Sequence, residues 1–167
     1  LFPGLINTHT HLYQDIMKGM GSDLSLEDWF PKSMAPAGAV LRERHVAAGV
    51  KLGLAEAIRC GVTTVADYMQ LQPVKGLGKL ELDIAKDMGV RMVYGRGYRD
   101  IGKKELVEKA EDVFADVTAL KEEFEGDGMY RVWLAPAAGW GASLELLKAT
   151  REYADRNATP IMMHMFE

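Results

Sequence analysis

Short apolar runs alternate along this 167-residue chain with longer segments in which apolar residues recur every third or fourth position. An apolar run of about four to eight residues between turn residues predicts a buried strand, and the wider spacing predicts a helix with one apolar face. Strand and helix in alternation indicate parallel βαβ units. The expected strands cover about residues 4–10, 62–67, 90–95 and 130–135, and a fifth begins at Pro160.

The ends of the helices are marked by capping and stop residues. Ser25 and Asp28 stand three residues apart, an arrangement that predicts a capped short helix through Trp29. Gly61 is the expected stop of a helix over about 43–60. Further helices are expected over about 77–88, 103–125 and 143–156, the last with Ser143 as its N-cap.

Composition and charge narrow the class of protein. The chain is 48% hydrophobic and 26% charged, which suits one globular core. A net charge of −4 gives no basic patch for nucleic acid, and no apolar run approaches membrane-spanning length. No basic and apolar leader opens the chain. The one cysteine, Cys60, excludes an internal disulfide and fits a reducing, cytoplasmic location.

The first predicted strand ends in His9 and His11. Residues two apart in a strand share one face, so both imidazoles are expected to point to one place. Neutral imidazole is a common zinc ligand, and two of them supply half of a tetrahedral site. Two surface histidines are the alternative, but both residues follow a Pro-Gly break and the apolar pair Leu5-Ile6. A metal site is therefore the stronger interpretation.

A third histidine, His164, lies in the apolar segment opened by Pro160, and Glu167 follows three residues later. An imidazole beside a carboxylate suits a metal ligand paired with a proton-transferring acid. Alternatively, His164 is a core histidine bonded to backbone and Glu167 is the charged residue that follows a strand. The presence of His9 and His11 favours the metal interpretation.

A resemblance to a known family runs nearly end to end. Three segments carry it: 3–11 reads PGLINTHTH, 61–67 reads GVTTVAD, and 164–167 reads HMFE. They resemble the first, second and fifth strands of the amidohydrolase superfamily. Together they are similar to the branch that holds adenosine, S-adenosylhomocysteine, guanine and 8-oxoguanine deaminases and the triazine hydrolases. The resemblance implies an α/β fold, the (β/α)8 or TIM barrel.

A complete barrel needs about 250 residues, more than this chain has. We therefore expect residues 1–167 to form a single partial barrel domain covering about strands 1 to 5, without strands 6–8 or the family's flanking β-sandwich. The open edges of strands one and five would favour aggregation unless they are covered. The hypothesis is that the remainder was not included, was lost, or comes from another chain, as a homo-oligomer or a complementing segment.

The resemblance also implies a metal centre. By motif, His9, His11 and His164 would be ligands of one divalent ion, zinc before iron, and Glu167 would be the catalytic proton shuttle. The family's strand-eight aspartate and strand-six histidine have no counterpart here. Dinuclear members carry a lysine on strand four, and segment 131–136, RVWLAP, has none. This favours one metal.

The implied activity is that of a metal-dependent aminohydrolase, or deaminase. Water activated by the metal would attack a ring carbon that bears an amino group in a small heterocyclic substrate. A triazine-type chlorohydrolase is the alternative within the family. A catalytically incomplete metal-binding fragment is the alternative outside it.

Three residues match substrate-contacting positions of the family. Trp29 would pack on a purine, Arg96 would line the pocket from just beyond strand three, and Gln14 would bind an edge of the heterocycle. Core packing for Trp29 and a solvated loop position for Arg96 are the alternatives. Asp67 is assigned a structural hydrogen bond rather than catalysis. Adenosine-type members usually carry a histidine after the strand-four proline, where this chain has Ala137. This departure argues against an adenosine-like substrate and leaves other amino-heterocycles open.

Overall fold

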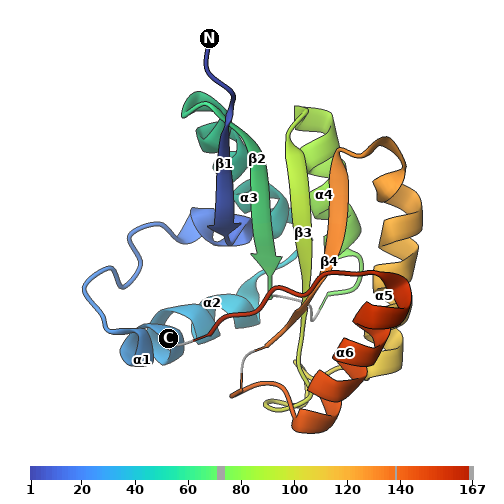
Figure 1. Ribbon diagram of the computed structural model, residues 1–167. Coiled ribbons are helices and arrows are strands. Elements are labelled where there is room, and N and C mark those ends of the chain that lie inside the picture. The colour runs from blue at the N-terminus through green and yellow to red at the C-terminus, as the bar shows by residue number, and fades with distance from the viewer. Residues whose placement is uncertain (71–73, 138, 166–167) are drawn as a thin grey trace.

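The computed structural model describes residues 1–70, 74–137 and 139–165. Four parallel strands pair in chain order as one twisted sheet, and their carboxyl ends lie at the bottom of Figure 1. The strands are β1 (Leu5–Thr10), β2 (Val62–Met69), β3 (Arg91–Tyr98) and β4 (Tyr130–Pro136). The βαβ alternation predicted from the sequence is confirmed.

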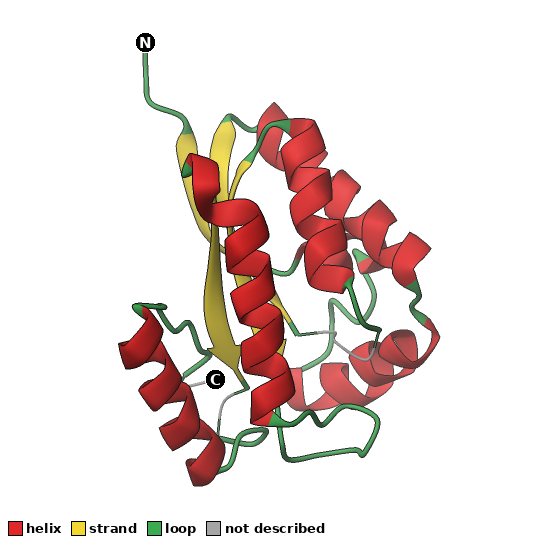
Figure 2. Ribbon diagram, turned by 90° about the vertical axis from the view of Figure 1, so that its right-hand side faces the viewer, coloured by secondary structure: helices red, strands yellow, loops and turns green. Residues whose placement is uncertain are grey.

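Helices connect the strands and pack mostly to one side of the sheet (Figure 2). Each has an apolar stripe, and the core lies between these stripes and the strands. No helix in the described part of the chain is long and apolar enough to cross a membrane. The main helices are α3 (Glu43–Arg59), α4 (Leu77–Met88), α5 (Ala110–Phe124) and α6 (Leu144–Asn157).

The predicted helix ends are largely confirmed. Ser143 accepts a hydrogen bond from the amide of Leu146 at 3.0 Å, as an N-cap does. Gly89 ends α4 with φ of 69°, a conformation that suits glycine. Ser25 likewise caps the single turn α1 (Leu26–Trp29).

Several short helical segments were not anticipated from the sequence. A 3-10 segment follows β1, a π-helical turn and α2 follow α1, and another 3-10 turn follows α5. Such short pieces are set by local packing rather than by a long apolar repeat. Their bounds are Leu12–Met17, Phe30–Met34, Ala35–Val40 (α2) and Glu125–Asp127.

The helix predicted over 103–125 begins later, at Ala110. The amide of Glu108 donates to the carbonyl of Arg99 at 2.9 Å, and the Glu108 carboxylate binds Arg96. These contacts with β3 hold residues 103–109 outside the helix. The prediction was wrong here because a tertiary ion pair overrides the local helical pattern.

The fifth strand is reduced to one parallel bridge between Leu134 and Ile161. Leu134 donates to the carbonyl of Pro160 at 3.0 Å and accepts from the amide of Met162 at 2.9 Å. The chain then leaves β4 and passes the carboxyl ends of the strands, as the dark red trace in Figure 1 shows. This departure brings His164 to the end of β1.

Candidate metal centre

Three histidines from the two ends of the chain meet at the carboxyl-terminal edge of the sheet. His9 lies in β1, His11 directly follows β1, and His164 comes three residues after the bridge at Ile161. One ring nitrogen from each lies within 4.8 Å of the other two. The ring centroids are 4.9 to 5.1 Å apart. This is the grouping expected from the sequence.

The ring of His11 is held by the neighbouring strand. Its Nδ1 atom lies 2.7 Å from the carbonyl oxygen of Tyr68 in β2. A carbonyl oxygen only accepts, so Nδ1 carries the proton and donates it. Nε2 is then left with a free lone pair, as in metal-bound histidines whose other nitrogen donates to a carbonyl.

The electrostatics of the cluster also favour His11 as a metal ligand. Burial, with smaller contributions from the neighbouring His164 and His9, lowers the pKa of His11 to about 4, although the hydrogen bond to the Tyr68 carbonyl opposes the shift. His11 therefore stays neutral at pH 7, and neutral imidazole is the form that binds metal. Three nitrogen donors, one of them in a fixed tautomer, fit a divalent ion such as zinc.

Asp67 stabilises the chain next to this site. Its Oδ1 accepts a hydrogen bond from the amide of Leu12 at 2.6 Å, and the residue has no exposed surface. Leu12 immediately follows His11. The structural hydrogen bond predicted for Asp67 is confirmed, although β2 continues two residues further, to Met69.

Arg96 lies within β3, not beyond it, and only 5% of it is exposed. The solvated-loop alternative is therefore wrong. Its guanidinium donates two hydrogen bonds to Glu108, at 2.7 and 2.8 Å, and one to Asp116 at 2.8 Å. These contacts tie the segment 99–109 to the sheet. Substrate binding by Arg96 stays a prediction.

The other predicted residues lie on the segments that follow β1. The indole nitrogen of Trp29 donates to the carbonyl of Met20 at 3.1 Å, and the ring packs against the core. The side-chain amide Nε2 of Gln14 donates to the hydroxyl of Tyr13 at 3.3 Å. Both side chains are half-buried. Glu167 lies outside the described residues.

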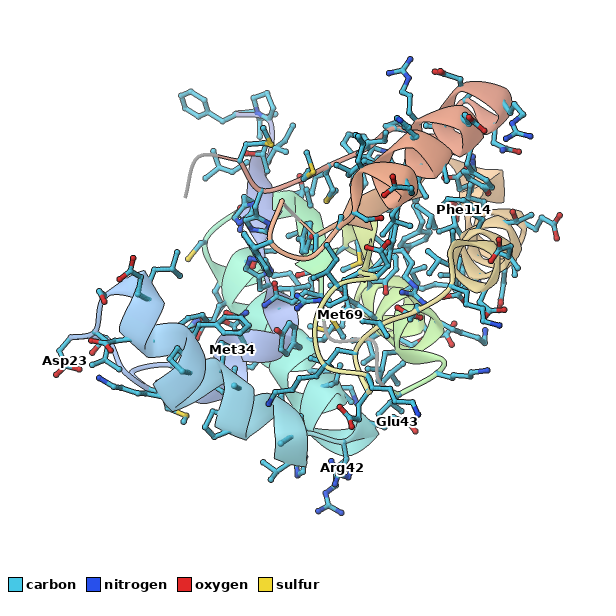
Figure 3. The ribbon with its side chains drawn as sticks, turned by 90° about the horizontal axis from the view of Figure 1, so that it is seen from below. Asp23, Met34, Arg42, Glu43, Met69 and Phe114 are labelled. Atoms are coloured by element: carbon cyan, nitrogen blue, oxygen red, sulfur yellow. The ribbon has the colours of Figure 1, made fainter. Side chains whose placement is uncertain are left out.

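A pocket of about 700 Å³ opens at the same edge of the sheet. Figure 3 looks onto this edge and labels Met34, from the pocket wall, and Met69, at the end of β2. Sequence reasoning missed the pocket's polar and aromatic lining. The signal available was position: Tyr98 ends β3, and Gln70 and Arg99 directly follow β2 and β3. The lining includes Tyr13, Phe30, Gln70, Tyr98 and Arg99.

One side of the pocket carries an aromatic and cationic cluster. The Arg99 guanidinium lies over the Trp140 ring, 5.2 Å from its centroid, and Phe30 meets the same ring at 6.3 Å. Trp140 is 52% exposed. The cluster joins the loop after β4 to the segments after β1 and β3.

Comparisons with known proteins agree with this geometry. The sequence profile of the Amidohydrolase family matches residues 1–167. The chain is 34% identical to a protein of Methanobrevibacter smithii named 5'-deoxyadenosine deaminase, over 100% of this chain and 37% of that protein. It is 30% identical to a protein of Pyrococcus furiosus named 5-methylthioadenosine/S-adenosylhomocysteine deaminase, over 100% of this chain and 38% of that protein. The chain thus spans under two fifths of these relatives.

Solved structures show the same fold. A mutant of the atrazine chlorohydrolase TrzN from Arthrobacter aurescens, complexed with zinc and atraton, superposes with a TM-score of 0.90 at 22% identity, over 99% of this chain and 41% of that one. An adenosine deaminase from Xanthomonas campestris with bound zinc superposes with a TM-score of 0.85 at 26% sequence identity. The match covers 98% of this chain and 36% of that one. The predicted partial barrel fold is confirmed.

Proposed function

Since the chain belongs to the amidohydrolase family, we propose that it carries part of the active site of a metal-dependent aminohydrolase. The reaction is hydrolytic removal of an amino group from a ring carbon of a heterocycle. One observation carries the proposal: His9, His11 and His164 bring ligand nitrogens within 4.8 Å of one another at the carboxyl ends of the strands. Active sites of this barrel fold are built at that end.

These three histidines would hold one divalent ion, and zinc suits a set of nitrogen donors. Two similar structures contain zinc, which supports this choice over iron. When bound, such an ion supplies the Lewis acidity that makes water nucleophilic at neutral pH. His11 contributes a neutral ring, because its Nδ1–H is bound by the Tyr68 carbonyl.

Glu167 would move the protons. It follows His164, one of the proposed ligands, by three residues in the sequence. In this role its carboxyl group takes a proton from the attacking water, gives it to a ring nitrogen of the substrate, and then helps ammonia to leave. A carboxylate that is not itself a ligand performs this task in nucleobase deaminases.

The proposed substrates are amino-heterocycles of purine size, adenosine derivatives among them. Two relatives carry the names of deaminases of such compounds, and a pocket of about 700 Å³ has room for a nucleoside. Trp29, Gln14 and Arg96 stay the proposed contacts from the sequence. Ala137 stands where adenosine-type members of the family usually carry a histidine, which leaves other amino-heterocycles open as substrates.

The proposal extends to location and assembly. The exposed single thiol of Cys60 suits a reducing cytoplasm. Exposed apolar residues of β1, Leu5 and Ile6, suit a covering segment or a second copy of the chain. Two relatives carry the names of deaminases, so the chlorohydrolase alternative ranks second.

The test is a substrate panel on the zinc-loaded full-length protein. Ammonia release is measured from 5'-deoxyadenosine, S-adenosylhomocysteine and guanine, and chloride release from atrazine. We expect ammonia from at least one purine, loss of this activity on chelation, and its return with zinc. Activity that survives complete removal of metal, or chloride release alone, would contradict the proposal.

A further inference from the structure

Two carboxyl groups are completely buried behind the metal centre. Asp67 in β2 and Glu81 in α4 have no exposed surface. Asp67 Oδ1 accepts from Leu12. No N–H or O–H group in the described ranges donates to Asp67 Oδ2 or to either oxygen of Glu81. Nor does a lysine or arginine of those ranges pair with either group. Asp67 and Glu81 can therefore hydrogen-bond to each other only if one of the two carboxyl groups carries a proton.

The two side chains satisfy each other once one of them is un-ionised. Two adjacent carboxylates out of water repel strongly, so one of them keeps its proton. Burial raises the pKa of Glu81 well above its usual value, and the charge of Asp67 and the hydrogen bond to it act in the same direction. Burial also raises the pKa of Asp67, to about 7, whereas hydrogen bonds from Glu81 and Leu12 lower it.

The hydrogen bonds decide which group holds the proton. The amide of Leu12 donates to Asp67 at 2.6 Å, and this bond favours the ionised form of Asp67. Glu81 receives no such bond from the described residues. The arrangement that gives Asp67 Oδ2 a donor is therefore an un-ionised Glu81 that donates to Asp67, which in turn accepts from Leu12.

This chain of hydrogen bonds ends beside a metal ligand. Leu12 directly follows His11, and Tyr68, which directly follows Asp67, accepts from the His11 ring. Asp67 also pairs with Thr10 across the sheet. Two consecutive residues of β2 thus fix both the ring of His11 and the backbone that leaves it.

We propose that Glu81 is a positioning residue of the metal centre, which donates as a carboxylic acid to Asp67 and so holds the chain that orients His11. The inference rests on the proposed metal site, but not on the identity of the substrate. Partners behind metal ligands commonly change metal affinity by about 10- to 100-fold when they are removed. Glu81 would act on His11 indirectly, through Asp67 and the backbone at Leu12.

The test compares Glu81→Gln with Glu81→Met in the full-length protein. Glutamine keeps the shape and an N–H donor for Asp67, whereas methionine keeps the length and has no donor. We expect Glu81→Gln to bind zinc within about threefold of the unchanged protein, and Glu81→Met to bind at least about tenfold more weakly, as measured by chelator competition. The visible spectrum of bound cobalt(II) should shift in Glu81→Met and not in Glu81→Gln.

A second measurement remains informative if Glu81→Met does not fold. The infrared spectrum of the unchanged protein at pH 7 should contain the carbonyl band of a buried carboxylic acid, and Glu81→Gln should lack it. Absence of that band, or equal zinc affinity in all three proteins, would overturn the inference. Lack of turnover on every substrate, together with these differences in metal affinity, would contradict the proposed function and leave the positioning role standing.

Discussion

The Nδ1 atom of His11 lies 2.7 Å from the carbonyl oxygen of Tyr68, so the ring donates to the neighbouring strand. This bond fixes the tautomer, and with it the nitrogen, Nε2, whose lone pair is free to bind a metal. The backbone of β2 therefore determines the tautomer of a side chain that directly follows β1. The same relationship leads to a prediction about protonation.

His11 should stay neutral well below the pH at which a free imidazole gains a proton. Because burial lowers its pKa to about 4, protons should not compete with a metal for this ring between about pH 5 and 7. Nitrogen NMR of the metal-free protein should show an Nδ1-protonated ring that titrates near pH 4. A midpoint near 6.5 would contradict this account of the site.

Replacing any one of the three clustered histidines should abolish tight zinc binding. His9→Ala, His11→Ala and His164→Ala each remove a nitrogen donor from the site, and zinc affinity should fall by at least about 100-fold. His45→Gln is the matched control, because its Nδ1 accepts from the amide of Arg42 at the start of α3. Metal analysis after dialysis separates the outcomes. Retention of zinc by His164→Ala would remove that residue from the ligand set.

Arg96→Met should destabilise the fold. It removes the cation that Glu108 and Asp116 share and releases the segment 99–109 from β3. Breaking a buried ion pair costs about 3–5 kcal/mol. Both carboxylates are partly exposed, and water can solvate them in the variant, so we expect the free energy of unfolding to fall by a smaller amount, about 2 kcal/mol.

Arg151→Met is the control for this prediction. Its ion pair with Asp155 on α6 is exposed, and such pairs contribute less than about 1 kcal/mol. Urea unfolding compares the two variants. Equal small losses would show that Arg96 does not anchor the segment, and would strengthen its predicted role in binding substrate.

Glu81→Gln should change how stability depends on pH. The pKa of Glu81 is raised in the folded state, so above about pH 4.5 the unfolded chain releases a proton that the native protein keeps. The native state binds more protons, and stability therefore falls as pH rises, by about 1.4 kcal/mol per pH unit from this group.

Glutamine removes that contribution, so the variant should gain stability relative to the unchanged protein between about pH 5 and 7. Glu145→Gln, at the start of α6 and exposed, is the control. Its difference from the unchanged protein in the free energy of unfolding should not depend on pH. A constant difference for Glu81→Gln over this range would mean that Glu81 is ionised in the folded protein.

Much of the architecture could be predicted because the signals are local. Gly61, Gly89 and Ser143 mark helix ends through backbone conformation and capping, which need no knowledge of the rest of the fold. Likewise, the His9 and His11 pair is predicted by the geometry of a strand. His164 is harder to place, since it stands 153 positions after His11. Its residue type and the nearby Glu167 suggest a ligand, and the resemblance to a family joins it to the other two histidines.

The errors have a common physical cause, which is contact between segments distant in sequence. Leu106 fits a helical stripe, yet the ion pair of Arg96 with Glu108 keeps its segment outside α5. Glutamate is a charged residue type that is expected at the surface. Only the packing of α4 on the sheet shows that Glu81 is buried against Asp67. Single-sequence patterns do not carry such information.

The central claim is that three imidazoles bind one ion. X-ray absorption spectroscopy of the zinc-loaded full-length protein measures this directly. We predict a first shell of nitrogen and oxygen at about 2.0–2.1 Å, with the outer-shell scattering of three imidazole rings and a loss of one ring in His164→Ala. A shell that contains sulfur, or one or no imidazole, would contradict the account.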